Sequence, residues 1–164
     1  MVEIAERLAT TAERQTLIRG LLEYRALLGR LGYNEGIQLV DGSFVEQVER
    51  LRGRPPGDID VFSFLDLPSL NVQDGALDAQ GERDWDAEII DVDRNKARFG
   101  IDSYAVIATD LDFFNLFSVI NYWTSLFGHQ RRTSAWKGFL LVALDPVSDA
   151  AALAHLEQLE AAHA

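Results

Sequence analysis

Two aspartates spaced two residues apart are the part of this sequence best suited to chemistry. Asp58 and Asp60 lead into an apolar run that is typical of a strand. Residues two apart in a strand point to the same face, so both carboxylates would project together while Ile59 packs into the core. Carboxylate oxygens are ligands that Mg²⁺ prefers. Two such ions, roughly 3.5–4 Å apart, stabilise the attacking and leaving oxygens of a phosphoryl displacement. The spacing therefore predicts metal-assisted phosphoryl transfer.

A Gly-Ser turn upstream of this pair could hold phosphate groups. Gly42 allows the backbone to turn tightly and to approach a ligand. Ser43 is the predicted N-cap of a short helix over 44–52, where its hydroxyl and the backbone N–H groups could meet phosphate oxygens. Arg132 and Lys137 could add phosphate contacts, a hypothesis that rests on their charge alone.

The acid pair by itself is a weak signal, because three other Asp-x-Asp pairs occur at 84/86, 91/93 and 110/112. These lie beside or within predicted helices, where side chains two apart diverge. We interpret them as helix caps or N-terminal acids. Asp58 and Asp60 differ in their context, with the turn before them and an apolar strand after them. Asp102, at the start of a later predicted strand, is the candidate third carboxylate, and an ordinary strand-edge acid is the equal alternative.

The elements that must position these residues alternate between helix and strand. Helices are predicted over 5–31, 44–52, 84–97, 110–127 and 148–163, and strands over 36–40, 59–65, 101–108 and 138–144. The polar segment 67–81 is predicted to be a flexible loop, and Ser148 to cap the last helix. This alternation predicts one α/β domain over 1–164, with a mixed sheet of about four strands flanked by helices. Its parts are an N-terminal helix 5–31, a core 36–144 and a C-terminal helix 148–163.

These motifs, in this order, resemble the nucleotidyltransferase superfamily, which includes beta-type DNA polymerases, antibiotic nucleotidyltransferases and minimal toxin–antitoxin nucleotidyltransferases. That family's pattern is a Gly-Gly or Gly-Ser turn, a short helix, Asp-x-Asp or Asp-x-Glu, and a later strand with a third acid. The matching residues are Gly42, Ser43, Asp58, Asp60 and Asp102. Further segments are similar to a little-characterised bacterial subgroup of small proteins: Lys96-x-x-x-Gly100-Ile101-Asp102, Tyr122-Trp123-x-x-Leu126-Phe127-Gly128, and Lys137-Gly138. The resemblance covers roughly Arg14 to Leu144.

The resemblance implies a nucleotidyltransferase-like fold and a defined reaction. A nucleoside monophosphate would pass from a nucleoside triphosphate, expected to be ATP, to a hydroxyl of a protein, RNA or small molecule, with release of pyrophosphate. Asp58, Asp60 and Asp102 would hold Mg²⁺, and Asp102 could also act as base toward the acceptor hydroxyl. Gly42 and Ser43 would hold the β- and γ-phosphates. The protein would contribute positioning and charge neutralisation.

A second function is a catalytically reduced member of that superfamily, serving as a binding or regulatory subunit in a toxin–antitoxin or phage-defence pair. Active minimal members often carry Arg or Lys just after the turn, whereas this chain has Phe44-Val45-Glu46. Glu46 would repel a triphosphate unless it points away. The loop is also long, with 14 residues between Ser43 and Asp58.

Composition excludes several other classes of function. A net charge of −11 argues against general nucleic-acid binding, which depends on Lys and Arg. We interpret the clusters of Arg50, Arg52 and Arg54 and of Arg94, Lys96 and Arg98 as solvated surface charge. No apolar run approaches the roughly 20 residues that span a bilayer, and the glutamates among residues 1–13 do not suit a signal peptide. Zero cysteines fit a reducing compartment, so we expect a cytoplasmic protein.

The segment 110–127 is apolar around almost its whole circumference. A helix of this kind is buried on more than one side. It predicts either a subunit interface, with a protein partner or as a homo-oligomer, or a central core helix under the sheet. His129, just after this segment, is interpreted as a surface loop residue rather than a catalytic one.

Overall fold

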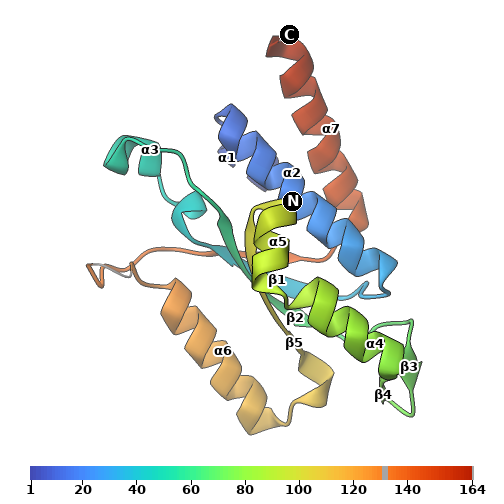
Figure 1. Ribbon diagram of the computed structural model, residues 1–164. Coiled ribbons are helices and arrows are strands. Elements are labelled where there is room, and N and C mark those ends of the chain that lie inside the picture. Colours follow the sequence, from blue (N-terminus) through green and yellow to red (C-terminus); the bar gives the residue numbers. More distant parts are fainter. Residues whose placement is uncertain (131–132, 164) are drawn as a thin grey trace.

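A four-stranded mixed sheet forms the centre of the protein (Figure 1). The structure is a computed structural model that describes residues 1–130 and 133–163. The strands are β1 (Gly36–Asp41), β2 (Ile59–Leu65), β5 (Ile101–Ile107) and β6 (Leu140–Ala143), in the spatial order β5-β2-β1-β6. β1 is antiparallel to β2 and β6, and β2 is parallel to β5. The predicted α/β class and the sheet of about four strands flanked by helices are confirmed.

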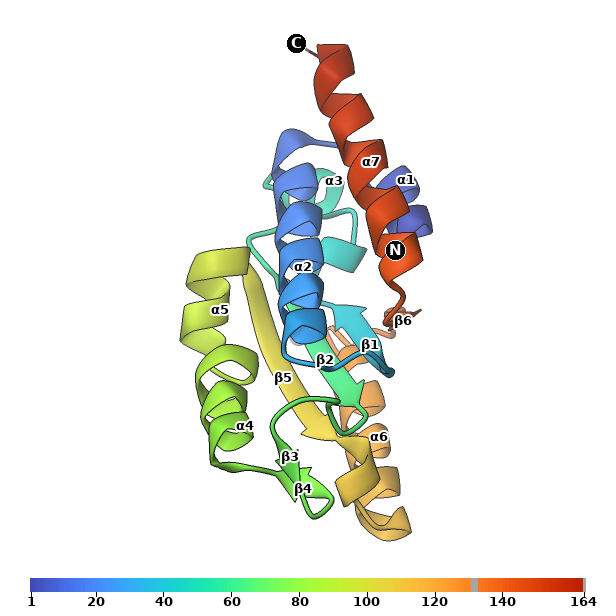
Figure 2. The ribbon, with the colours of Figure 1, turned by 90° about the vertical axis from the view of Figure 1, so that its right-hand side faces the viewer.

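Helices cover the two faces of this sheet unequally, as Figure 2 shows. One face is covered by a layer that contains α1 (Val2–Leu8), α2 (Ala12–Arg30), α5 (Val92–Phe99) and α7 (Pro146–His163). The other face carries α6 (Phe113–Phe127). The larger core lies under the first layer. A smaller one joins the sheet to α6, where the ring of Trp123 stacks on Phe62 with the centroids 4.2 Å apart.

Alternation along β2 explains how one strand serves both cores. Ile59 and Val61 are buried in the larger core, whereas Phe62 and Phe64 belong to the cluster beneath α6. Successive side chains of a strand point to opposite faces, so a strand that is covered on both sides is apolar at nearly every position. The strand predicted over 59–65 has these bounds in the structure.

The first two predicted helices are each divided in the structure. The segment 5–31 forms α1 and α2 because Thr11 is the N-cap of α2, where its Oγ1 accepts a hydrogen bond from Arg14 N at 3.3 Å. The segment 44–52 forms a 3-10 turn, η1 (Ser43–Val45), followed by α3 (Val48–Arg52). The prediction that Ser43 caps a helix is therefore wrong, since Gly42 occupies the position before η1 and makes no side-chain bond.

The segment between β2 and β5 is more structured than expected. Its first part, predicted to be loop, contains a hairpin of β3 (Val72–Gln73) and β4 (Ala76–Leu77). The helix predicted over 84–97 is replaced by α4 (Ala79–Asp84), a π-helical turn η2 (Trp85–Ile89) and α5. The break before α5 is stabilised by Asp91, whose Oδ1 accepts from Arg94 N at 3.0 Å. This confirms the interpretation of Asp91 as a cap.

The last two helices also differ in where they begin. The 3-10 turn η3 (Ala108–Asp110) precedes α6, and Asp112 caps that helix. α7 begins at Pro146, two residues earlier than predicted. Ser148 is not its cap, because Ser148 Oγ accepts a hydrogen bond from the N-terminal ammonium of Met1 at 2.7 Å. Within residues 1–130 and 133–163, no helix is long and apolar enough to cross a membrane.

The buried side chain of Arg25 joins α2 to the sheet and to α7. Its Nε lies 2.9 Å from Asp149 Oδ2. Its Nη1 donates to Gln38 Oε1 at 2.7 Å, and its Nη2 donates to the Ala143 carbonyl at 2.7 Å. A buried charge is tolerated only where it is paired and hydrogen-bonded in this way. Arg25 therefore fixes the positions of three separate elements at once.

We expect Arg25→Ala to lower the free energy of unfolding by about 3–5 kcal/mol, because it leaves buried polar partners without their cation. Urea denaturation followed by circular dichroism measures this loss. The matched control is Arg19→Ala, which removes an ion pair with Glu160 whose side chains are 31% and 52% exposed. Its expected loss is at most about 1 kcal/mol. Equal losses in the two variants would contradict the role given to Arg25.

Candidate functional site

Aspartates from three adjacent strands form a row at one end of the sheet. The register pairs Asp41 with Asp60 across β1 and β2, and Asp60 with Asp102 across β2 and β5. Asp60 precedes Phe62 by two residues, so the row projects to the face that α6 covers. By the same alternation, Asp58 lies on that side. The structure thus brings the predicted trio to one place, together with Asp41, which its sequence context did not single out.

Gly42 brings the backbone of the turn against one of these carboxylates. Its φ is +86°, and a Cβ at this position would lie 2.5 Å from Asp60 Oδ2. The backbone conformation therefore favours glycine strongly, and a Cβ here would displace the Asp60 carboxylate. Ser43 follows as the first residue of η1 and lines the pocket described below. The structure places this turn against Asp60, and the predicted approach to a ligand stays a prediction.

The segment after the turn is held by the buried guanidinium of Arg14. Its Nη1 donates to the Phe44 carbonyl at 2.7 Å and its Nη2 donates to the Glu46 carbonyl at 2.6 Å. Its Nε pairs with Glu49 Oε1 at 2.5 Å. The side chain of Phe44 is fully buried. The position that follows the Gly-Ser turn therefore contributes to the core, which explains why no basic residue occupies it.

Glu46 faces the pocket, and neighbouring side chains partly compensate its negative charge. Its Oε2 accepts a hydrogen bond from Gln130 Nε2 at 2.5 Å and lies 3.9 Å from Arg52 Nη2. The sequence left open whether this carboxylate points toward or away from a bound triphosphate. In the structure it points inward, so a polyanionic ligand would have to share Arg52 with it.

Both lysines of the chain pair with the aspartates of the row. Lys96 Nζ lies 2.6 Å from Asp58 Oδ2 and 2.9 Å from Asp102 Oδ1, although the latter contact lacks the angle of a hydrogen bond. Two hydrogen bonds raise the pKa of Lys96 above its usual value. The one to Asp58 has the larger effect and the one to Asp102 Oδ2 the smaller. Lys137 Nζ lies 2.8 Å from Asp41 Oδ2. Lys137, which was predicted to contact phosphate, therefore has a carboxylate partner in the structure.

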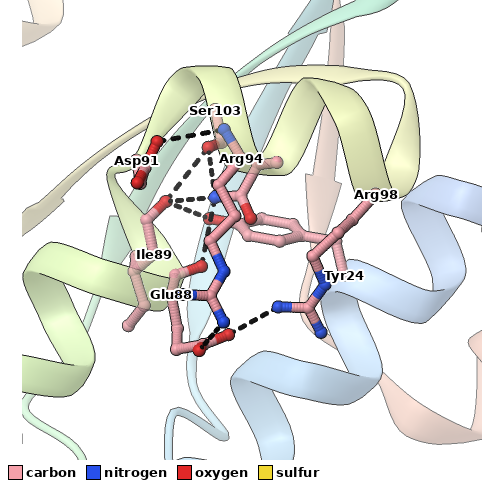
Figure 3. Close-up of polar contacts among 8 residues, drawn as sticks. Tyr24, Glu88, Ile89, Asp91, Arg94, Arg98 and Ser103 are labelled. Carbon is pink, nitrogen blue, oxygen red and sulfur yellow. Dashed lines mark hydrogen bonds and ion pairs between the residues drawn. The ribbon is translucent and has the colours of Figure 1, made fainter.

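A buried polar network fixes the helix that carries Lys96 (Figure 3). The Nδ2 of Asn95 donates to Ser103 Oγ at 2.8 Å and to the Ile89 carbonyl at 3.1 Å. Ser103 Oγ and Tyr24 OH donate to the same carbonyl at 3.0 and 3.2 Å. Asn95 directly precedes Lys96, and Ser103 directly follows Asp102, the partner of Lys96 in an ion pair. The network therefore sets the distance between α5 and β5 at the site.

A pocket of about 260 Å³ adjoins the row of aspartates and reaches the C-terminal end of α6. Its lining combines both signs of charge, and includes Asp41, Gly42, Ser43, Glu46, Arg52, Arg54, Asp58, Asp60, His129, Gln130 and Lys137. Arg52 and Arg54, interpreted from sequence as solvated charge, therefore face a cavity. Among the described residues, Lys96 and Asp102 do not line it. The predicted phosphate contact Arg132 lies outside the described residues.

His129 belongs to this pocket rather than to an open loop surface. Its Nδ1 lies 2.8 Å from the Ser125 carbonyl, and its ring centroid lies 4.1 Å from that of Trp136. No local sequence signal predicts this placement, because the contact with Trp136 depends on how the chain returns after α6. The His129 side chain therefore forms part of the pocket lining.

The carboxylates fit a divalent metal ion by their chemistry, and Lys96 competes for the same position. They are hard oxygen donors. Within the described chain, Asp41 Oδ1 and Asp102 Oδ1 are buried without a hydrogen-bond partner. Yet no group of three or more His, Asp or Glu among the described residues is arranged to hold a metal ion. The ammonium of Lys96 lies between Asp58 and Asp102, where a shared cation would otherwise bind.

These features define a mixed α/β domain with an acidic, lysine-balanced row beside a polar pocket. The chain belongs to the family of unknown function DUF6932, whose model matches residues 1–143. The match includes every aspartate and both lysines of the row. No curated protein and no solved structure matches the chain significantly.

The pair of Asp41 and Lys137 predicts a pH-dependent loss of stability. Burial raises the pKa of Asp41, and the Lys137 ammonium opposes that rise. Lys137→Met should therefore raise the pKa of Asp41 further. A raised carboxyl pKa means that the folded state binds the proton more tightly, so the loss is small at acidic pH and grows as pH rises through that pKa. We expect about 3 kcal/mol at pH 7.

Urea denaturation at acidic and neutral pH measures this loss, and carboxyl NMR titration follows Asp41 directly. The control Lys137→Arg keeps the positive charge and should retain most of the stability. A loss of equal size at both pH values would contradict the assignment to Asp41.

The position of Lys96 predicts how the site responds to divalent cations. Lys96→Met removes a positive charge from between two carboxylates, so we expect Mn²⁺ to bind roughly tenfold more tightly or better. Isothermal titration calorimetry with Mn²⁺ alone measures the affinity. The control is Arg98→Met, which removes a cation from the same helix that pairs instead with Glu88 at 2.6 Å. If both variants bind Mn²⁺ like the wild type, Lys96 does not compete with the metal.

Proposed function

We propose that this protein is a Mg²⁺-dependent nucleotidyltransferase that transfers a nucleoside monophosphate from a triphosphate, expected to be ATP, to a hydroxyl of a protein, RNA or small molecule. The observation that carries the proposal is the register of Asp60 with Asp102 on adjacent parallel strands, beside the close approach of Gly42 to Asp60. The Gly-Ser turn, Asp58 and Asp60 line the pocket, and Asp102 lies beside it in register with Asp60, which supports the proposal.

The turn, the two arginines and the aspartates each have a role in this proposal. The backbone at Gly42 and Ser43 would hold the β- and γ-phosphates, and Arg52 and Arg54 would add positive charge from α3 and the loop after it. Asp58, Asp60 and Asp102 would hold Mg²⁺, which when bound neutralises charge on the phosphates and the leaving group. Asp102 is also the proposed base toward the acceptor hydroxyl.

A second candidate is a catalytically reduced nucleotidyltransferase-like subunit that binds or regulates, within a toxin–antitoxin or phage-defence system. The observation that favours it is the ion pair of Lys96 with two of the three proposed metal ligands. The inward-facing Glu46 acts in the same direction, because it adds negative charge where a triphosphate would lie.

We expect the purified protein with Mg²⁺ and α-labelled ATP to label an acceptor or to release pyrophosphate. Asp60→Asn should reduce this activity by at least about a hundredfold, because it removes a carboxylate ligand. Thin-layer separation measures the labelled acceptor, and a coupled pyrophosphatase assay measures the unlabelled pyrophosphate. The matched control is Asp74→Asn, an exposed aspartate in the β3–β4 hairpin, which should leave the rate unchanged.

Calorimetry with ATP, with and without Mg²⁺, separates the two candidates. Metal-dependent binding without transfer to any acceptor would favour the reduced, regulatory subunit. Absence of metal-dependent binding at millimolar ATP would contradict the enzymatic function.

A further inference from the structure

The outer face of α6 is exposed although it is strongly apolar. Val119, Trp123 and Phe127 pack toward the sheet. The rest of the helix surface, its outer face, exposes 77% of Phe113, 80% of Phe114, 62% of Phe117 and 60% of Tyr122. The helix has no charged residue from its first residue to its last. Exposed aromatic side chains gathered on one helix are typical of an interaction site.

The exposed surface continues from α6 onto the sheet. Ile37 and Leu141 are 42% and 66% exposed. Leu141 lies in register with Leu39, and Ile37 with Phe64, so both project to the α6 side. α6 therefore covers the sheet only in part, and β1 and β6 leave apolar side chains beside it.

The size of this surface is sufficient for a stable interface. An aromatic side chain buries about 150–250 Å² when it is covered. At their observed exposures, the four aromatic residues of the outer face supply on the order of 500 Å². Ile37, Leu141, Ile120 and Leu126 add to this total. The sum approaches the roughly 800 Å² that each partner contributes to a standard specific interface.

We propose that a second copy of this chain covers the surface, with the two α6 helices packed antiparallel about a two-fold axis. The residue types of the outer face are complementary about the midpoint between Val119 and Ile120. A two-fold axis at that point brings Phe114 against Ser125, Phe117 against Tyr122 and Ser118 against Asn121. In the first pair a large residue meets a small one, in the second two aromatic residues meet, and in the third two polar residues meet. Such self-complementarity is what an isologous interface requires.

The shape of the helix surface suits the same arrangement. A shallow hollow on α6 is lined by Phe117, Ser118, Asn121, Tyr122, Ser125 and Leu126. The Phe114 ring of a second copy would enter this hollow near Ser125. Ser118 Oγ already donates to the Phe114 carbonyl of its own helix at 2.7 Å, so this hydroxyl can be buried without a new partner.

Charge also favours a second copy at this face over other faces. Two chains with a net charge of −11 repel each other wherever their acidic surfaces approach. An uncharged helix of 15 residues allows close contact without that repulsion. The proposal concerns α6 alone and does not depend on the proposed enzymatic function.

Sedimentation equilibrium of the full chain over a range of concentrations tests the proposal, with a reversible dimer as the expected result. Phe114→Glu places two like charges in the interface and should weaken the dimer roughly a hundredfold or more. Far-UV circular dichroism should be unchanged, since the side chain is 80% exposed. The matched control is Val147→Glu, at a residue 79% exposed at the start of α7, which should leave the dimer intact.

A second variant tests the antiparallel arrangement itself. In the proposed dimer Phe114 of one copy faces Ser125 of the other, so Phe114→Glu combined with Ser125→Lys should restore association. A wild-type chain that stays monomeric at all concentrations would overturn the proposal, including one that instead binds lipid vesicles or another protein. A dimer that survives Phe114→Glu would overturn it as well. Failure of the double variant to dimerise would overturn the antiparallel pairing.

Discussion

The charge balance at one end of the central sheet is the constraint on which the arrangement of this protein depends. Strand register places Asp41, Asp60 and Asp102 side by side, and like charges at such separations repel strongly in a partly buried setting. The chain has two lysines, and both bind this row. The buried amide network positions α5, which carries Lys96. The chain that returns after α6 carries Lys137.

The same balance sets what the pocket could do. A site for a polyanion and its metal needs carboxylates and cations that can exchange partners, whereas stability favours carboxylates that are already paired. Lys96 is at the centre of this conflict because its side chain is half-exposed, unlike that of the more buried Lys137. The two proposed functions differ chiefly in whether Lys96 leaves its carboxylates when a nucleotide and a divalent cation arrive.

The two faces of the sheet have different consequences. The layer containing α2, α5 and α7 encloses a large core, and Arg25 ties this layer to the strands. The face under α6 is only partly covered, and its outer surface would be buried by a second copy. Leu126 and Phe127 line the pocket as well as belonging to α6. Dimerisation through this helix would therefore take place directly beside the candidate site.

Features that depend on neighbouring residues could be read from the sequence, and features that depend on distant ones could not. A nearly continuous apolar run predicted the strand 59–65. The turn at Gly42 and the cap at Asp91 could be predicted because their signals span a few positions. Tertiary structure alone decided that Asp41 joins the row, and that Lys96 meets Asp58 across 38 residues of chain. It also decided that Phe44 enters the core. The physical reason is that strand register and long-range ion pairs arise from packing between elements, which no local pattern of residues specifies.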